Sequence, residues 1–269
     1  MDKERIDKQL VNRDLARSRA KAKRVIMSGV VYVDGSLVDK PGQQVPEDAD
    51  IEVRGEGNKY VSRGGKKLQG VLERFEVTVE GCRALDIGAS TGGFTDCLLQ
   101  HGAVEVWALD VGKGQLDWKL RNDDRVHVRE NFNARYLEPE DLPYAVDLIT
   151  IDVSFISLEL ILSPAASVIR DSGQVLVLVK PQFEAGPGKV ERGGVVNDPQ
   201  VHRQVLERLI ASAREQGLAP LEVAPSPVRG KVSKNVEYFL LLQEGVPSYS
   251  GIYQQAYRAI DEAQETFSD

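Results

Sequence analysis

The sequence predicts an α/β protein with one seven-stranded sheet, preceded by a small α+β unit. From residue 63 onward, short hydrophobic runs alternate with amphipathic helical patterns. A glycine-rich turn joins the first of these runs to a helix, as in doubly wound sheets. The first 55 residues instead combine basic helices with a hairpin pattern, so we expect them to form a separate unit.

The N-terminal unit has short elements of both kinds. An Asp34-Gly35 pair between two apolar runs is a strong hairpin signal, because both residues tolerate a positive φ. We therefore expect helices at 5–10 and 16–27, a hairpin within 29–38, a loop at 40–46 and a strand at 50–53. We place the domain boundaries at 1–55 for this unit, 56–62 for a polar linker and 63–269 for the sheet domain.

The sheet domain begins with a helix that runs through Phe75, and strands and helices then alternate. The predicted strands are Arg83–Ile87, Val104–Asp110, Val126–Arg129, Asp147–Ile151, Gln174–Val179, Leu221–Ala224 and Val236–Leu242. Helices follow the first two strands, and others are expected at Leu158–Arg170, Pro199–Gln216 and Tyr253–Thr266. This alternation is typical of a Rossmann-like sheet.

Charge and composition exclude several classes of protein. The chain of 269 residues has no apolar run long enough to span a membrane, and its charged start is not a signal peptide. Cys82 and Cys97 lack metal-site spacing, so we expect no metal and a reduced, cytoplasmic setting. Residues 1–67 carry 15 Lys and Arg against 11 Asp and Glu, whereas the remainder carries 19 against 30. A basic N-terminal unit followed by an acidic sheet domain suggests that the N-terminal unit binds a polyanion.

The glycine-rich turn predicts a nucleotide-type cofactor site. It runs from Asp86 to Phe94, and such a turn aims helix N–H groups at a ligand. Asp110 ends the next strand, where a carboxylate can accept hydrogen bonds from a ribose diol. Ser90 stands where glycine is frequent in methyltransferases, and Asn133 either meets an adenine or caps a turn. This layout is shared by NAD-binding and S-adenosylmethionine-binding proteins.

Charged residues also end two later strands of the predicted sheet. Asp152 closes the fourth strand and Lys180 the fifth, each after a strongly apolar run. A charged group in that place is costly if it is buried without a partner. Ligands bind beyond the carboxyl ends of parallel strands. Four charged residues at one edge therefore favour a functional site: Asp86, Asp110, Asp152 and Lys180.

The N-terminal unit resembles the S4-type RNA-binding domain. The matching residues are Leu15-Ala-Arg-Ser-Arg-Ala-Lys-Ala-Lys-Arg-Val-Ile-Met-Ser-Gly-Val-Val-Tyr-Val-Asp-Gly35, and the match continues through Val38–Gly42. Lysine and arginine side chains on one helix can neutralise phosphates. The predicted RNA-binding residues are Arg17, Arg19, Lys21 and Arg24.

Five segments, in order, resemble the TlyA family, which older naming calls haemolysin A and which is related to FtsJ-type RNA 2′-O-methyltransferases. They are Tyr60-Val-Ser-Arg-Gly-Gly-Lys-Lys-Leu68, Asp86-Ile-Gly-Ala-Ser-Thr-Gly-Gly-Phe94, Asp152-Val-Ser-Phe-Ile-Ser157, Val179-Lys-Pro-Gln-Phe-Glu184 and Gly193-Gly-Val-Val-Asn-Asp-Pro-Gln-Val-His202. The resemblance implies an S-adenosylmethionine-dependent methyltransferase that acts on cytidine 2′-hydroxyls of ribosomal RNA, in the free RNA or in ribosomal subunits.

The resemblance also implies which residues act. The family carries a Lys-Asp-Lys-Glu tetrad, which matches Lys67, Asp152, Lys180 and Glu237, with Lys66 the neighbour that competes for the first position. Lys180 either takes the proton of the 2′-hydroxyl or holds the oxygen as it gains charge. The predicted cofactor-binding residues are Asp86, Gly88, Ser90, Gly92, Gly93, Phe94, Asp110, Asn133 and Asp152.

Other functions compete with this interpretation. An RNA-binding assembly factor with little catalysis would have a broken tetrad or glycine turn, and neither is broken here. A membrane-active haemolysin lacks support from any apolar span or strongly amphipathic basic helix. If the chain were an NAD-dependent oxidoreductase, the basic N-terminal unit and Lys180 would have no explained role. The loop at 184–194 is expected either to close over RNA or cofactor or to be a plain surface loop.

Overall fold

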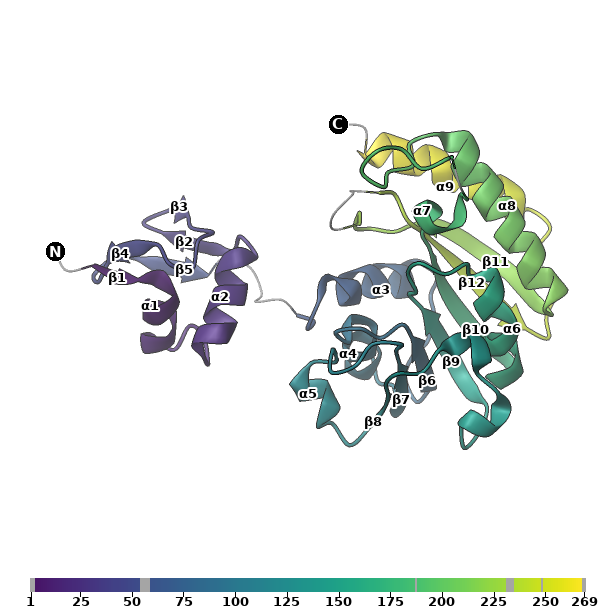
Figure 1. The fold of residues 1–269 in the computed structure, drawn as a ribbon, viewed down its shortest axis with the longest axis horizontal. Coiled ribbons are helices and arrows are strands. Elements are labelled where there is room, and N and C mark those ends of the chain that lie inside the picture. Colours follow the sequence, from purple (N-terminus) through teal and green to yellow (C-terminus); the bar gives the residue numbers. More distant parts are fainter. Residues whose placement is uncertain (1–2, 54–58, 187, 231–234, 248, 268–269) are drawn as a thin grey trace. The chain divides into compact units, whose positions relative to one another are not determined.

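The computed structural model describes residues 3–53, 59–186, 188–230, 235–247 and 249–267. The chain divides into two compact units, Met1–Lys59 and Tyr60–Asp269 (Figure 1). The last residues of the predicted linker pack with the second unit, since Tyr60 is buried in its core and the Val61 N–H donates to Asp96. Residues 56–58 of that linker lie outside the described residues.

The first unit is a small α+β structure. Its elements are β1 (Lys3–Arg5), α1 (Ile6–Asn12), α2 (Arg19–Met27), β2 (Val31–Val33), β3 (Ser36–Leu37), β4 (Gln44–Pro46) and β5 (Ile51–Val53). Ser18 caps α2 by accepting from the Lys21 N–H at 3.3 Å. Asp34 and Gly35 both have positive φ, as the predicted hairpin turn between β2 and β3 requires.

One local prediction for this unit is wrong. Residues 44–46 belong to a strand, β4, and not to a loop, because they pair antiparallel with β1. Pro46 is tolerated at the end of such a short pair, where a missing N–H costs little. Apolar side chains of α1, α2 and the strands then enclose one small core that includes Ile6, Leu10 and Ile26.

The second unit alternates strands and helices as predicted. It begins with α3 (Arg63–Arg74), β6 (Arg83–Ile87), α4 (Gly93–Gln100), β7 (Glu105–Leu109), α5 (Trp118–Arg121) and β8 (Val126–Arg129). It continues with two 3-10 turns (Ala134–Tyr136 and Pro139–Asp141), β9 (Val146–Ile151), α6 (Glu159–Val168), β10 (Ile169–Val179) and α7 (Pro181–Glu184). It ends with α8 (Pro199–Glu215), β11 (Leu218–Pro225), β12 (Tyr238–Glu244) and α9 (Ile252–Phe267).

The seven strands form one sheet in the order β11-β12-β10-β9-β6-β7-β8. The neighbours from β10 through β8 are parallel, whereas β12 is antiparallel to both β10 and β11. The reversal of strand order beside β6 is the switch point at which doubly wound sheets bind ligands. The predicted Rossmann-like class is therefore confirmed.

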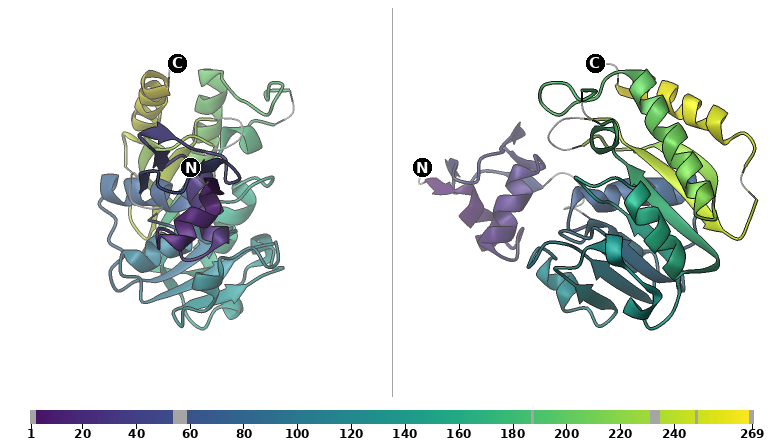
Figure 2. Two further views of the ribbon diagram at one scale, coloured as in Figure 1. Left: turned by 90° about the vertical axis from the view of Figure 1, so that its left-hand side faces the viewer. Right: turned by 45° about the vertical axis from the view of Figure 1, so that its right-hand side comes forward.

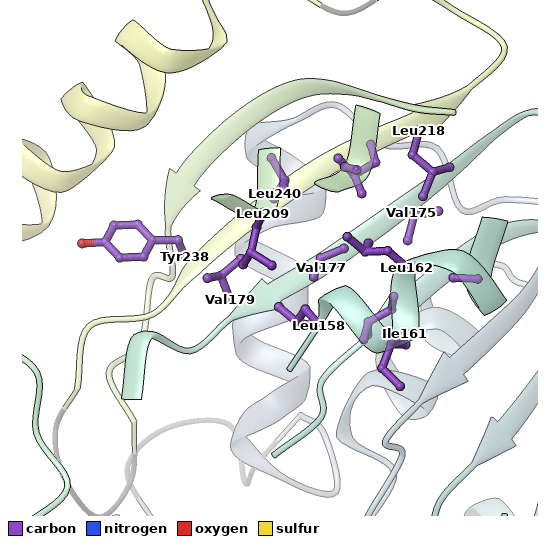
Figure 3. Packing of buried hydrophobic residues seen from close by; sticks show 14 of the residues in the cluster. Leu158, Ile161, Leu162, Val175, Val177, Val179, Leu209, Leu218, Tyr238 and Leu240 are labelled. Carbon is purple, nitrogen blue, oxygen red and sulfur yellow. The ribbon is translucent and has the colours of Figure 1, made fainter. Parts of the chain in front are cut away.

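Helices cover both faces of this sheet (Figure 2). Because successive side chains of a strand point to opposite faces, Val175, Val177 and Val179 pack in a cluster with α6, α8 and α9. Figure 3 shows Val177 and Val179 beside Leu158 and Leu209 in that cluster. Leu176 and Leu178 face the other way, against α3 and α4. Burial on both faces explains why these strands have continuous apolar runs.

Helix α6 ends two residues before the predicted boundary at Arg170. Ile169 has extended backbone angles and pairs with Val146, so the chain enters the sheet at that point. Within the described ranges, none of the helices combines the length and the apolar character that crossing a bilayer requires.

Candidate active site

The carboxyl edge of the parallel strands gathers the charged residues that the sequence singled out. Asp110 follows β7, Asp152 follows β9 and Lys180 follows β10. Because β12 runs antiparallel, its beginning reaches the same edge, with Glu237 directly before it. The register pairs Val179 with Tyr238, which places Lys180 and Glu237 opposite one another at the next position.

Lys180 is held to the segment after β9 by one ion pair and two hydrogen bonds. Its Nζ forms an ion pair with Asp152 Oδ1 at 2.6 Å. It also donates to the Val153 carbonyl and to Ser154 Oγ, each at 3.0 Å. The Lys180 side chain is only 11% exposed, so these acceptors replace the water that an ammonium group otherwise binds.

A second ion pair lies beside the first. Lys67 Nζ of α3 donates to Glu237 Oε2, although 170 residues separate the two in sequence. Both side chains are largely buried, and Lys66 is exposed. The four tetrad residues therefore form two Lys–carboxylate pairs, Lys67 with Glu237 and Lys180 with Asp152.

Asp86 lies beneath this edge and is completely buried. Its Oδ2 accepts from the Thr95 N–H at 2.9 Å and from Thr95 Oγ1 at 2.7 Å, and its Oδ1 accepts from Thr150 Oγ1 at 3.1 Å. Burial raises the pKa of this carboxyl group to about 7, against the opposing effect of these hydrogen bonds. Asp86 thus ties the start of α4 to the sheet and fixes the glycine turn from below.

The glycines of the turn permit close packing within the protein. Gly88 has a φ of +86°, and a Cβ there would lie 2.5 Å from the Asp152 carbonyl oxygen. Gly92 caps α4 with a φ of +90°, and a Cβ on Gly93 would overlap Ser62 Oγ before α3. Phe94 is buried against Phe239, with ring centroids 6.1 Å apart. The turn is therefore wedged between α3 and the segment that carries Asp152.

Ser90 and Asp110 meet at the open side of the turn. The Ser90 N–H donates to Asp110 Oδ2 at 2.7 Å, and the Gly112 N–H donates to Oδ1 at 2.6 Å. Each carboxylate oxygen retains a lone pair for a further donor. Asn133 is exposed and uses its Oδ1 to accept from the Arg135 N–H at 3.1 Å, which is the capping alternative among its two predicted roles.

The first unit presents the basic residues that were predicted to bind RNA. Arg17, Arg19, Lys21 and Arg24 are all exposed. Arg19 donates to Asp7 Oδ2 at 3.2 Å, and Arg5 makes two hydrogen bonds of 2.9 Å to the same carboxylate. Hydrogen bonds from Arg5 hold the pKa of Asp7 at about 2, so one buried anion anchors two cationic side chains.

Two family models match the chain. Residues 60–244 match the FtsJ-like methyltransferase model, and residues 4–51 match the S4 domain model. The chain is 45% identical to the 16S/23S rRNA (cytidine-2'-O)-methyltransferase TlyA of Mycobacterium tuberculosis, over 96% of this chain and 97% of that protein.

The chain belongs to the TlyA family of FtsJ-like methyltransferases.

Two further similarities extend over almost the whole chain. A relative from Bacillus subtilis, YqxC, named as a candidate rRNA methyltransferase, is 44% identical over 99% of this chain and 96% of its own length. The chain is also similar to a solved structure of a candidate hemolysin from Streptococcus thermophilus, with 41% identity and a TM-score of 0.78. The match covers 100% of this chain and 98% of that one. This TlyA-family protein is thus an S-adenosylmethionine-dependent methyltransferase with an N-terminal S4 domain.

The open side of the turn fits that cofactor chemically. The partly exposed carboxylate of Asp110 has the acceptors that a ribose diol needs. Val111, the next residue, is 68% exposed and offers an apolar surface for an adenine ring. Both lie at the carboxyl end of β7, beside the switch point of the sheet.

Sequence reasoning missed an aromatic pair beside Lys180. Phe155 is 89% exposed, and its ring centroid lies 4.6 Å from that of Phe183. Lys180 Nζ lies 5.9 Å from the Phe183 centroid, so the Phe183 ring of this pair borders the ammonium group. Phe155 and Ser154 are part of the quoted Asp152–Ser157 segment, but an aromatic residue in an apolar segment is expected to be buried.

Proposed function

We propose that this protein transfers a methyl group from S-adenosylmethionine to the 2′-hydroxyl of a cytidine in ribosomal RNA. The choice of substrate is supported by the TlyA relative from Mycobacterium tuberculosis, whose name states that activity. The observation that carries the proposal is the pairing of Lys67 with Glu237 and Lys180 with Asp152 at one sheet edge. Without those pairs the fold would fit many other methyl acceptors.

We assign the cofactor to the open side of the glycine turn. Asp110 would accept from the ribose hydroxyls, Val111 would contact the adenine, and Ser90 would hold Asp110 in place. Gly88, Gly92, Gly93, Phe94 and Asp86 would shape the turn through the contacts described above. Bound there, S-adenosylmethionine supplies an electrophilic methyl group, and the remaining work is to position the hydroxyl.

Lys180 is the residue we assign to the 2′-oxygen. An ammonium has three N–H donors, and Nζ uses two of them in hydrogen bonds to Val153 and Ser154 beside the ion-paired Asp152 carboxylate. We infer that the 2′-hydroxyl of the substrate displaces Ser154 Oγ and accepts a hydrogen bond from Lys180 Nζ in its place. As the O–CH3 bond forms and the S–CH3 bond breaks, the hydroxyl proton would leave to water. Lys180 would stabilise the oxygen while that proton leaves, and Asp152 would keep the ammonium in place. Lys67 on α3 and Glu237, directly before β12, would border the same oxygen.

The aromatic pair and the first unit complete the RNA site. Phe155 exposes a ring that packs against Phe183, which in turn borders Lys180, and this suits stacking of an unpaired base near the reacting ribose. Arg17, Arg19, Lys21 and Arg24 would bind phosphates through the S4 domain. A ribosomal substrate, free or in a subunit, also implies that the protein acts in the cytoplasm.

The decisive experiment uses tritiated S-adenosylmethionine with ribosomal RNA and subunits from a strain that lacks the gene. We expect label in RNA, recovered as 2′-O-methylcytidine after nuclease digestion. Label on another nucleoside would correct the base, and label on a base atom would refute 2′-O transfer. Cofactor binding without transfer to RNA or to either subunit would favour an assembly factor with little catalysis.

A further inference from the structure

The short helix α7 holds one loop from both of its ends. Lys180, which directly precedes α7, contacts Asp152, Val153 and Ser154 at the beginning of the loop. Glu184, the last residue of α7, contacts the end of the same loop. The loop between β9 and α6, residues 152–158, is therefore attached to α7 at two places, and Phe155 lies between them.

The Glu184 contacts use both carboxylate oxygens. Oε1 accepts from the Leu158 N–H at 2.8 Å, and Oε2 accepts from Ser157 Oγ at 2.9 Å. Leu158 is the N-cap of α6 and has no side chain that can cap it, so Glu184 supplies a negative charge at that helix start. Glu184 is 5% exposed, and Arg208 of α8 donates to its carbonyl at 2.7 Å.

The loop between these attachments has an unusual backbone. Phe155 has a φ of +62°, a region that a bulky residue rarely adopts. It is also highly exposed, so burial of its own ring does not account for that conformation. Such a conformation persists only when the surrounding structure enforces it. The two attachments to α7, at 152–154 and at 157–158, are the contacts that flank it.

We propose that Glu184 is a positioning residue for methyl transfer. By fixing the end of the loop at 152–158, it keeps Asp152 paired with Lys180 and holds the Phe155 ring beside them. This inference rests on the proposed function, in which Lys180 and Phe155 contact the nucleotide. Glu184 itself contacts neither substrate nor cofactor, because its oxygens face the start of α6.

The test compares E184Q with E159Q. Both changes remove a carboxylate that pairs with Arg208. The Glu159 side chain is 39% exposed, whereas that of Glu184 is 2% exposed, so E159Q is the control for loss of the ion pair alone. The measured quantity is kcat for RNA methylation, normalised to the number of S-adenosylmethionine sites found by binding. We expect this kcat to fall about tenfold in E184Q, because a small misplacement at a reacting centre lowers the rate steeply. In E159Q it should fall less than twofold. The dissociation constant for S-adenosylmethionine is expected to be unchanged in both.

S157A provides a milder variant that keeps Glu184 and removes one of its two donors. We expect a loss of a few fold, and amide hydrogen exchange of 153–158 faster than in wild type for S157A and E184Q but not for E159Q. The effects of E184Q and F155A on kcat should be less than additive, whereas E184Q and R19A should be additive.

Full additivity of E184Q with F155A, or a normal kcat per site in E184Q and S157A, would overturn the proposal. If the wild-type protein methylates no RNA, the proposed function fails. The exchange rates at 153–158 then still decide whether Glu184 holds the loop.

Discussion

Each unit contains a completely buried aspartate, and the two have opposite pKa shifts. Asp7 in the first unit has its pKa lowered to about 2, mainly by hydrogen bonds from Arg5. Asp86 in the second unit has its pKa raised to about 7, mainly by burial. The difference shows that the partner decides the ionisation state, since guanidinium groups compensate a buried charge and hydroxyl groups do so only in part.

The two units use that difference for different purposes. In the first, Asp7 holds cationic side chains that remain exposed, which suits binding to a phosphate backbone. In the second, Asp86 is an internal support, and both lysines of the tetrad are paired with carboxylates at the sheet edge. We therefore expect changes in the first unit to alter RNA affinity and changes at the sheet edge to alter turnover.

The largest effect should come from Lys180. Replacing it with alanine removes the donor that stabilises the 2′-oxygen, and we expect kcat to fall about 1,000-fold. K180R keeps the charge, so it should retain measurable turnover if Lys180 acts through charge, and none if it must accept a proton. Single-turnover methylation at saturating RNA measures both. A near-normal rate for K180A would remove Lys180 from the chemistry.

The next largest effect should come from G88A. The added Cβ would lie 2.5 Å from the Asp152 carbonyl oxygen, so the segment that pairs with Lys180 must move. We expect turnover to fall about 100-fold, as misplacement of a reacting group does elsewhere. G81A is the matched control, because Gly81 has a similar φ of +76° and open space around its Cβ position. Equal losses in the two variants would assign the effect to backbone strain alone.

The pH dependence of stability tests the two aspartates directly. Asp7 has a folded pKa below its ordinary value of 3.8, so its contribution to stability is present above pH 4 and is lost as pH falls towards 2. Asp86 has a folded pKa above 3.8, so its contribution is present below pH 4 and is lost as pH rises through 7.

Peptide-resolved hydrogen exchange separates the two units in this experiment. D7N should destabilise the first unit at pH 7 and have little effect near pH 2, and D39N, at an exposed carboxylate, is its control. D86N should destabilise the second unit less at pH 8 than at pH 5, because the wild-type carboxyl group is ionised and buried at the higher pH. The reverse trend for D86N would show that its donors keep Asp86 ionised throughout.

Much of the fold follows from local sequence patterns, and the site follows less directly. The strands of the sheet were predictable because burial on both faces produces apolar runs such as Val175–Val179. The turn at Asp34-Gly35 was predictable because its backbone angles suit few residues. Strand β4 was missed because its partner, β1, is distant in sequence and neither strand has an apolar run.

Contacts within the site depend on distant residues. No spacing rule connects Lys67 with Glu237, and only the family resemblance brought them together before the structure did. Asp86 was predicted to bind the cofactor from its place at a strand end, whereas its oxygens contact Thr95 and Thr150. Phe155 could not be found from the sequence, because its exposure depends on how α7 holds the loop around it.

The smallest effects should come from single cations of the first unit. R17A and K21A each remove one exposed charge of the predicted RNA-binding set, so RNA affinity should fall a few fold. The dependence of log Kd on log salt should decrease by about one per contacted phosphate, and kcat at saturating RNA should not change. K8A is the control, because Lys8 is an exposed cation of α1 outside that set. An equal loss in K8A would mean that the first unit attracts RNA through net charge alone, and a reduced kcat in R17A would break the division of labour between the two units.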